Sequence, residues 1–227
     1  MKFSPWAGFI AAAFSLSSLQ AADASHAEWV PLFNGKDLNG WTQRGGNAKY
    51  SVAGDEIVGA CVPNTPNSFL CTTRAYTNFV LELEFKVADE LNSGIQVRSE
   101  CFDTAKEMEF AGKKIKIPAG RVHGYQFEID PSGRAWTGGL YDEGRRGWLQ
   151  DLKTNDVARA AFKKGAWNKF HIECQGDSLK SWLNDVPIAD YKDGLTPAGF
   201  IALQVHGVGK KEETMEVHFR HLRIKEQ

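Results

Sequence analysis

The sequence predicts an all-β protein, an antiparallel β-sandwich of the jelly-roll type. Runs of four to nine residues that are apolar, or that alternate between apolar and polar, dominate the chain and are bounded by Gly, Pro, Asn or Asp, as is typical of strands. No long segment repeats apolar residues at i, i+3 and i+4, so crossover helices are not expected. The 22 glycines and the 11% aromatic content agree with many turns around a packed core.

The predicted elements follow one another without an internal boundary. In chain order, the predicted strands cover residues 56–58, 79–87, 94–99, 125–129, 170–174, 179–183, 200–205 and 216–224. One or two helical turns are expected within 156–162. No repeat, low-complexity tract or change of composition divides the chain, so we expect a single domain over residues 28–227.

The N-terminal residues 1–22 have the features of a secretory signal peptide. Lys2 is the only charged residue before Asp23, and a largely apolar stretch from Trp6 to Leu19 is followed by small residues. Cleavage is expected between about residues 21 and 25. The apolar stretch is too short and too rich in serine for a membrane span; an uncleaved apolar helix is the alternative. We expect an exported protein, periplasmic or secreted, without membrane attachment once the signal is removed.

Charge and cysteine content argue against some classes of function. The chain has 27 basic and 28 acidic residues, and this balance argues against a nucleic-acid partner, which needs a clustered basic excess. The chain has four cysteines, and an oxidising compartment permits disulfides between them. Cys61 and Cys71 flank the loop CVPNTPNSFLC, so we expect a local bridge there, although the sequence does not exclude the other pairings. No C-x-x-C supports zinc or thioredoxin-like chemistry.

Alternation gathers polar side chains on one face of several predicted strands. Successive side chains of a strand point to opposite faces of a sheet, so the strands at 94–99, 125–129 and 200–205 bury apolar residues on one side only. An ordinary solvated face is the alternative, and we prefer it for 170–174 and 216–224. On the other three strands we expect a ligand cleft on a concave sheet. Its predicted polar residues are Gln96, Arg98, Gln126, Glu128, Asp130, Gln204 and His206.

Several segments, in their order along the chain, resemble a known family. They are LFNGKDLNGW, LNSGIQVRSE, GYQFEIDP, TGGLYDEGRRGWL, GAWNKFHIECQGDSLKSWLNDVP and GFIALQVHG. In this order and spacing they resemble the 3-keto-disaccharide hydrolase domain, formerly called DUF1080, from about residue 28 to the C-terminus. Many members of that family carry the Glu and Gln of YQFEID in the opposite order. The resemblance implies a concanavalin A-like jelly roll in an exported bacterial protein of sugar catabolism.

The resemblance implies an oxidised glycoside as the substrate. A ketone at C3 of a sugar acidifies the C2 proton, so a base forms an enolate that expels the C1 substituent, and water then adds to complete a net hydrolysis. We expect Glu128 and His206 to supply the acid and base, and Arg98 to stabilise the enolate oxygen. The alternatives are an ion pair between Glu128 and Arg98, and a hydrogen bond from His206 to a loop carbonyl.

The remaining polar groups are expected to bind the sugar. Gln96, Gln126, Asp130 and Gln204 suit hydroxyl groups, because amides and carboxylates combine donors and acceptors. The segment TGGLYDEGRRGWL is expected to be a loop, and the residues predicted to contact the sugar from it are Tyr141, Glu143, Arg146 and Trp148. A salt-bridged lid is the alternative for this segment. A divalent metal held by a Glu–His pair is left open, since no H-E-x-x-H occurs, and no cofactor is assigned.

Two functions from different classes remain in view. The first is an enzyme that cleaves 3-keto-glycosides by elimination or hydrolysis. The second is a non-catalytic, lectin-like carbohydrate-binding module that uses the same polar face. No G-x-S-x-G, G-x-x-x-x-G-K-[ST] or G-x-G-x-x-G motif supports other chemistry. The sequence leaves open the sugar, its linkage and the oligomeric state.

Overall fold

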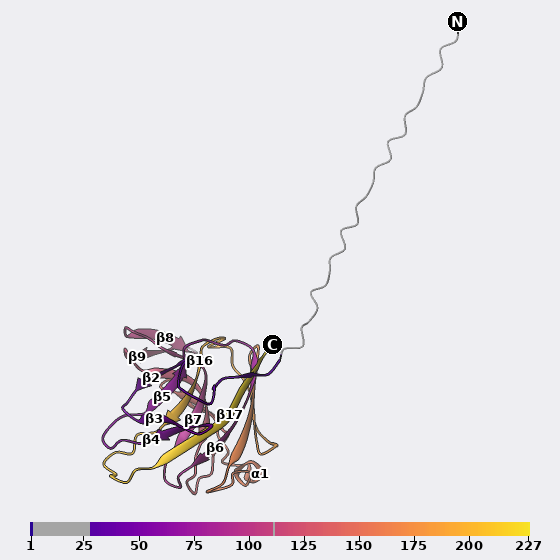
Figure 1. The fold of residues 1–227 in the computed structure, drawn as a ribbon. Coiled ribbons are helices and arrows are strands. Elements are labelled where there is room, and N and C mark those ends of the chain that lie inside the picture. Colours follow the sequence, from indigo (N-terminus) through magenta and orange to yellow (C-terminus); the bar gives the residue numbers. More distant parts are fainter. Residues whose placement is uncertain (2–27, 111) are drawn as a thin grey trace.

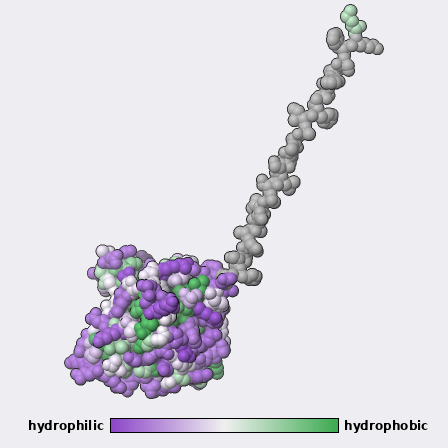
Figure 2. Space-filling model, viewed as in Figure 1, coloured by the Kyte–Doolittle hydropathy of each residue, from purple (hydrophilic) through white to green (hydrophobic). Residues whose placement is uncertain are grey.

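The computed structural model describes Met1 and residues 28–110 and 112–227, so the predicted signal peptide at residues 1–22 lies outside the described part but for Met1. The described residues form two antiparallel sheets packed face to face, which confirms the predicted all-β sandwich (Figure 1). No helix in this part of the chain is long and apolar enough to cross a membrane. The surface turned toward the viewer in Figure 2 is mostly hydrophilic.

The first sheet has eight strands, in the order β15-β14-β13-β6-β17-β4-β3, with β1 paired to β17. Its strands are β1 (Val30–Pro31), β3 (Lys49–Ala53), β4 (Glu56–Ala60), β6 (Phe79–Val87), β13 (Asn168–Gln175), β14 (Ser178–Leu183), β15 (Val186–Lys192) and β17 (Glu216–Glu226). The long central strands β6 and β17 pair with each other and hold the sheet together.

The second sheet has seven strands, in the order β12-β11-β10-β7-β16-β5-β2. Its strands are β2 (Trp41–Gly45), β5 (Ser68–Thr72), β7 (Ser93–Cys101), β10 (Val122–Ile129), β11 (Leu140–Glu143), β12 (Gly147–Gln150) and β16 (Phe200–Val205). The three strands for which the sequence predicts a polar face therefore lie side by side, as β10-β7-β16. This adjacency is what allows their polar residues to form one site.

Two smaller elements complete the fold. The strands β8 (Lys106–Phe110) and β9 (Lys113–Ile117) form a separate hairpin, at the upper left in Figure 1. The only α-helix of the described residues, α1 (Asp156–Arg159), is shorter than the predicted 156–162; the Asn155 side chain caps its start by accepting from the amide of Ala158.

Alternating side chains of the two sheets fill the space between them. The most deeply buried side chains from the two central strands β6 and β10 are Phe79, Leu81, Leu83, Phe85, Tyr125, Phe127 and Ile129, each at most 1% exposed. Burying one such side chain contributes about 1.5–3 kcal/mol. Because alternate residues of a strand face opposite sides, this core forces the intervening polar residues of β10 onto the outer face of the seven-stranded sheet.

The predicted disulfide between Cys61 and Cys71 is not formed, and all four cysteines have free thiols. Cys61 belongs to the main core between the sheets, where its sulfur accepts a hydrogen bond from the Met215 amide. Cys71 lies in β5 and packs in a separate apolar cluster with Phe69, Val122 and Ala202. The two cysteines are close in sequence but belong to different layers, so the short loop between them does not bring their sulfur atoms together.

Candidate active site

A cavity of about 390 Å³ lies on the outer face of the seven-stranded sheet, and most of the predicted site residues line it. The predicted residues in the lining are Gln126, Glu128, Asp130, Tyr141, Glu143, Trp148, Gln204 and His206. They come from β10, β11, β12 and the end of β16. The structure therefore brings together residues that are up to about eighty positions apart in the sequence, as the alternation of the strands predicts.

Glu128 is the buried acid of this cavity. Its carboxyl group is 5% exposed and accepts hydrogen bonds from the side chains of Asn92, at 2.6 Å to Oε1, and Gln126, at 2.7 Å to Oε2. Burial raises the pKa of Glu128 to about 7, although these two hydrogen bonds and the charge of Arg134 act in the opposite direction. A carboxyl group with this pKa exchanges protons readily near neutral pH, which suits a general base.

Within the described part of the chain, Gln204 places an unpartnered polar group in the lining of this cavity. Its side chain is fully buried and lines the cavity, yet neither its oxygen nor its nitrogen has a hydrogen-bond partner among the described residues. A buried amide without partners is destabilising, and native proteins rarely keep one without a reason. A hydroxyl or carbonyl group of a bound molecule would satisfy the donor and the acceptor together.

Two further ionisable groups face the same cavity. His206 is exposed, and its Nδ1 lies 2.8 Å from the carbonyl oxygen of Gly207, as expected for a histidine at a strand end. In the neutral ring, donation from Nδ1 leaves Nε2 free to exchange a proton. Burial raises the pKa of Glu143, although the neighbouring charges of Arg121 and His206 lower it. Arg121 holds the Glu143 carboxylate through a 2.7 Å hydrogen bond.

An arginine stacked on aromatic rings forms one wall of the cavity. The guanidinium carbon of Arg134 lies 4.7 Å from the ring centre of Trp136 and 5.2 Å from that of Trp148. Its Nε donates to Asp130 at 2.7 Å, and its Nη2 lies 3.7 Å from Glu128. Tyr141 packs edge-on against Trp148, with 5.2 Å between the ring centres. The wall thus combines a cation with the edges of aromatic rings, and both can contact a sugar.

Arg98 is not in the cavity, contrary to the prediction. A bulge in β7 interrupts the alternation, because the pairing with β10 shifts between His123 and Tyr125. Arg98 takes a positive φ of 44° and is fully buried. Its guanidinium group donates to the carbonyl oxygens of Thr77 and Gly176, both at 2.6 Å, and to the Asn78 side chain. It neither pairs with Glu128 nor faces a substrate; it ties together the segments at the start of β6 and between β13 and β14.

Two other predicted contacts are also placed away from the cavity. Gln96 is fully buried, and both ends of its amide are used in hydrogen bonds to Gln126 and Ser99, so it has no group left for a substrate. Arg146 turns to the opposite face of the sheet, where it binds Asp142 at 2.5 Å and Asp193 at 2.7 Å. It lines a different cavity, next to the β8–β9 hairpin.

The segment TGGLYDEGRRGWL is a β-hairpin, not the predicted loop. β11 and β12 pair across a turn in which the Arg145 amide donates to the Asp142 carbonyl. Alternation then separates its residues: Tyr141, Glu143 and Trp148 face the cavity, whereas Asp142 faces away from it and binds Arg145 and Arg146. The segment thus contains both of the predicted alternatives, a ligand contact on one face and an ion-pair cluster on the other.

The sequence reasoning missed two residues of the cavity, Asn92 and Arg134. Asn92 lies just before β7, where the sequence Asn-Ser-Gly reads as a turn. Arg134 follows β10 by five residues, and only its spacing of four from Asp130 hinted at an ion pair. Both act from connecting segments, to which strand alternation does not apply.

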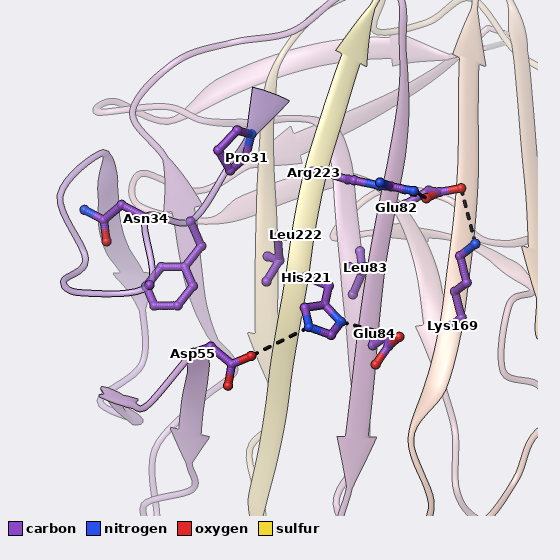
Figure 3. Close-up of a pocket in the computed structure, with 12 residues that line it drawn as sticks. Pro31, Asn34, Asp55, Glu82, Leu83, Glu84, Lys169, His221, Leu222 and Arg223 are labelled. Carbon is purple, nitrogen blue, oxygen red and sulfur yellow. Dashed lines mark hydrogen bonds and ion pairs between the residues drawn. The ribbon is translucent and has the colours of Figure 1, made fainter. Parts of the chain in front are cut away.

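A larger cavity, of about 630 Å³, lies on the outer face of the eight-stranded sheet. Figure 3 shows that its charged groups pair with one another. His221 lies between Asp55, at 3.6 Å, and Glu84, at 3.5 Å, and Glu82 binds Arg223 at 2.5 Å. Its polar side chains thus have partners within the protein, unlike Gln204. We therefore place the candidate active site at Glu128.

Comparison with known proteins identifies the family of the chain and agrees with its fold. Residues 28–225 match the family model of the 3-keto-alpha-glucoside-1,2-lyase-like domain. The chain belongs to this family. No curated protein matches its sequence. The family assignment covers nearly all of the described residues and therefore includes every residue of the Glu128 cavity.

Solved structures similar to this member of the 3-keto-alpha-glucoside-1,2-lyase-like family share its fold. A Bacillus subtilis protein with a galectin-like fold has a TM-score of 0.59 at 12% identity, over 88% of this chain and 94% of that one. The carbohydrate-binding module CBM66 from Bacillus subtilis has a TM-score of 0.55 at 16% identity, over 82% and 95%. A Bacillus licheniformis β-glucanase has a TM-score of 0.55 at 12% identity, over 90% and 100%. At these identities the likeness establishes the fold.

The described residues contain no cluster of three or more His, Cys, Asp or Glu side chains placed to hold a metal ion. Within the cavity, the acidic groups of Glu128 and Asp130 are engaged by amides and by Arg134.

Proposed function

We propose that this protein cleaves 3-keto-glycosides, including 3-keto-disaccharides, by removing the C2 proton of the oxidised sugar in the Glu128 cavity. One observation carries the proposal: a buried carboxyl group with a pKa of about 7 lines the same cavity as a buried amide, Gln204, that lacks partners among the described residues. The family membership supports the substrate class. A base near neutral pKa next to an unused donor is the combination that enolate formation needs.

The proposed reaction divides between three side chains. Glu128 takes the C2 proton, and the electrons of the broken C–H bond form the enolate with the C3 ketone. The Gln204 amide donates a hydrogen bond to the ketone oxygen as negative charge develops there. When the ketone re-forms, the C1–O bond breaks, and His206 in its imidazolium form donates its Nε2 proton to the leaving oxygen. Elimination leaves a C1–C2 double bond, and addition of water across it gives net hydrolysis.

The wall of the cavity orients the sugar ring. Trp148 and Tyr141 present ring edges and faces to the ligand, while Asp130 and Glu143 offer carboxylate oxygens to hydroxyl groups. Although burial opposes it, hydrogen bonds from Ser132 and Arg134 keep the pKa of Asp130 below its ordinary value, so Asp130 acts as an acceptor and not as a second base. This division leaves Glu128 as the proton acceptor of the cavity.

The test is direct cleavage by the purified protein. It is incubated with a 3-keto-disaccharide and, separately, with the same disaccharide before oxidation, and the released monosaccharide is quantified by chromatography. We expect release from the oxidised sugar only. Glu128→Gln should lower kcat at least 100-fold, the range usual for a general base, and His206→Ala should lower it as well. Release from neither sugar, or an unchanged kcat in both variants, would refute the proposal.

A carbohydrate-binding module is the second candidate. It is favoured by the aromatic wall of Trp148 and Tyr141 and by the structural likeness to CBM66. Calorimetry with unoxidised oligosaccharides distinguishes the two functions. Binding of these sugars without cleavage of the oxidised ones would favour the module, and the raised pKa of Glu128 would then have no catalytic use.

We also propose that the protein acts outside the cytoplasm, because residues 1–22 have the pattern of a signal peptide. The protein, produced with its N-terminus intact in a bacterial host, should be recovered from the periplasm or the medium. Its mature N-terminus should fall between about residues 21 and 25. Recovery of the full-length chain from the cytoplasm would refute export.

A further inference from the structure

A chain of hydrogen bonds connects Glu128 to the bulge in β7. Ser99 Oγ lies 2.6 Å from Gln96 Oε1, Gln96 Nε2 lies 2.6 Å from Gln126 Oε1, and Gln126 Nε2 lies 2.7 Å from Glu128 Oε2. Ser99, Gln96 and Gln126 are all 2% exposed or less, so water does not compete for these bonds. This hydrogen-bond chain runs beneath the cavity and ends at Glu128, the proton acceptor of the proposed function.

The direction of the chain follows from the chemistry of its ends. An ionised carboxylate only accepts hydrogen bonds, so Gln126 must turn its NH₂ group toward Glu128 and its oxygen toward Gln96. Gln96 must then offer its own NH₂ group to Gln126, which turns its oxygen toward Ser99. The hydroxyl of Ser99 completes the hydrogen-bond chain as a donor. Gln96 Oε1 is closer to it than its alternative acceptors, the carbonyl oxygens of Val97 at 3.1 Å and Tyr125 at 3.4 Å.

The backbone is shaped to make room for this chain. A Cβ atom on Gly94, which is directly opposite Glu128 in the sheet, would lie 2.6 Å from Cδ of Gln126. A Cβ atom on Gly124, which has a φ of 143°, would lie 2.3 Å from Oγ of Ser99. Two glycines thus leave the space that the buried Gln126 and Ser99 side chains occupy, which is independent support for a built network.

We propose that Ser99, Gln96 and Gln126 are positioning residues that form a one-way hydrogen-bond chain and hold Glu128 in place as a proton acceptor. The chain keeps an N–H group of Gln126 aimed at the carboxylate, and the amide cannot turn over without reversing two further bonds. This inference rests on the proposed function for the role of Glu128 but not for the existence of the chain. Gln126 also lines the cavity, whereas Gln96 and Ser99 lie behind it and act only through Gln126.

Other titratable and charged groups line the same cavity as Glu128. Arg134 approaches from the segment after β10, Asp130 lies at the end of β10, Tyr141 and Glu143 face it from β11, and His206 faces it from the end of β16. A test of the chain must therefore leave these groups unchanged and alter only the residues behind Gln126.

The test reverses the direction of the hydrogen bonds by a substitution at Gln96. In Gln96→Glu, the new carboxylate only accepts, so it takes the NH₂ group of Gln126 and turns the oxygen of that amide toward Glu128. Gln96→Met removes two links of the hydrogen-bond chain and Ser99→Ala removes one, both without adding charge. Gln43→Glu is the charge-matched control, because Gln43 lies on β2 of the same sheet and bonds only to the Gly46 and Ala48 carbonyls. Thermal unfolding confirms that each variant is folded.

The readout is the protonation of Glu128 itself and needs no substrate. The side-chain carboxyl carbon is followed by ¹³C NMR as a function of pH in the purified protein, and its signal is assigned by its loss in Glu128→Gln. We expect the midpoint to rise by about one pH unit in Gln96→Glu. A smaller rise is expected in Gln96→Met and Ser99→Ala, and none in Gln43→Glu.

Two results would overturn the inference. One is an unchanged midpoint in folded Gln96→Glu protein. The other is a raised titration midpoint of Glu128 in Gln96→Glu alone, with the midpoint unchanged in Gln96→Met and Ser99→Ala. Charge repulsion between the two carboxylates would then explain the rise without a hydrogen-bond chain. The titration does not depend on turnover, whereas the proposed reaction is measured by release of the monosaccharide. The two experiments can therefore refute the hydrogen-bond chain and the proposed reaction separately.

Discussion

Replacing Glu128 with Gln should make the protein more stable at alkaline pH while it removes the proposed base. The carboxyl group is almost fully buried, and burial raises its pKa from the ordinary value of 4.5 to about 7. An acid whose pKa is higher in the folded state than in the unfolded state destabilises the fold as it ionises. This destabilisation is absent well below pH 4.5, grows as the pH rises from about 4.5 to 7, and is constant above that range.

The size of the effect follows from the two pKa values. Each pKa unit corresponds to about 1.4 kcal/mol, so full ionisation of Glu128 lowers the free energy of unfolding by about 3 kcal/mol. Between pH 5 and pH 8 the change is about 2.5 kcal/mol, because the unfolded chain is already partly ionised at pH 5. A Gln side chain does not ionise, but its NH₂ group faces the donor of Asn92 or Gln126. That lost hydrogen bond lowers stability by about 1 kcal/mol at every pH.

The net expectation for Glu128→Gln is a stability within about 1 kcal/mol of the unmodified protein at pH 5, and about 2 kcal/mol higher at pH 8. Urea unfolding followed by tryptophan fluorescence at several pH values measures both quantities. The exposed Glu212 provides the matched control, Glu212→Gln. All other titrating groups are common to the proteins compared and cancel. If Glu128→Gln shows the same pH dependence of stability as the unmodified protein, Glu128 does not titrate as a buried acid and the reasoning is wrong.

Three further substitutions test other parts of the site. Gln204→Leu should weaken sugar binding at least tenfold by calorimetry without loss of stability, because it removes a buried amide that lacks partners among the described residues; unchanged binding would contradict this. Arg98→Ala should lower the free energy of unfolding by about 3 kcal/mol, because it leaves two buried carbonyl oxygens without a donor. A loss below about 1 kcal/mol in urea unfolding would show that these hydrogen bonds do not stabilise the bulge. Gly94→Ala should lower kcat at least tenfold in a folded protein, because the added Cβ atom displaces Gln126. Gly133→Ala should have no effect, because a Cβ atom there meets no atom within 4 Å. Equal kcat values for the two variants would count against the placement of Gln126.

The fold was predictable because it depends on short-range patterns. All eight predicted strands exist, since apolar alternation such as that of Tyr125, Phe127 and Ile129 is dictated by a two-sided sheet. The strands that the sequence reasoning missed have weaker patterns. β11 and β12 carry mixed charge and glycine, and the turn between them holds the ion pairs of Asp142 with Arg145 and Arg146.

The site was predictable where alternation persists and unpredictable where it breaks. Gln126, Glu128 and Gln204 lie in regular stretches of β10 and β16 and were assigned to the correct face. Arg98 was assigned to the wrong face because nothing in LNSGIQVRSE signals a positive φ at an arginine. The bulge is stabilised by carbonyl groups of segments distant in the sequence, so local reasoning does not reveal it.

Burial raises the pKa of Glu128, and the bulge keeps a second arginine off the face of the sheet that carries this carboxyl group. With unbroken alternation, Arg98 would lie on the outer face, on the same side as Glu128 and Gln126. A second guanidinium on that face would add to the charge of Arg134, which already acts to lower the pKa of Glu128. The bulge turns Arg98 into the interior and places the neutral hydroxyl of Ser99 behind Gln96. Neutral donors orient the carboxylate without pairing its charge with a second arginine. The pKa of Glu128 therefore stays at about 7, where a general base is most effective.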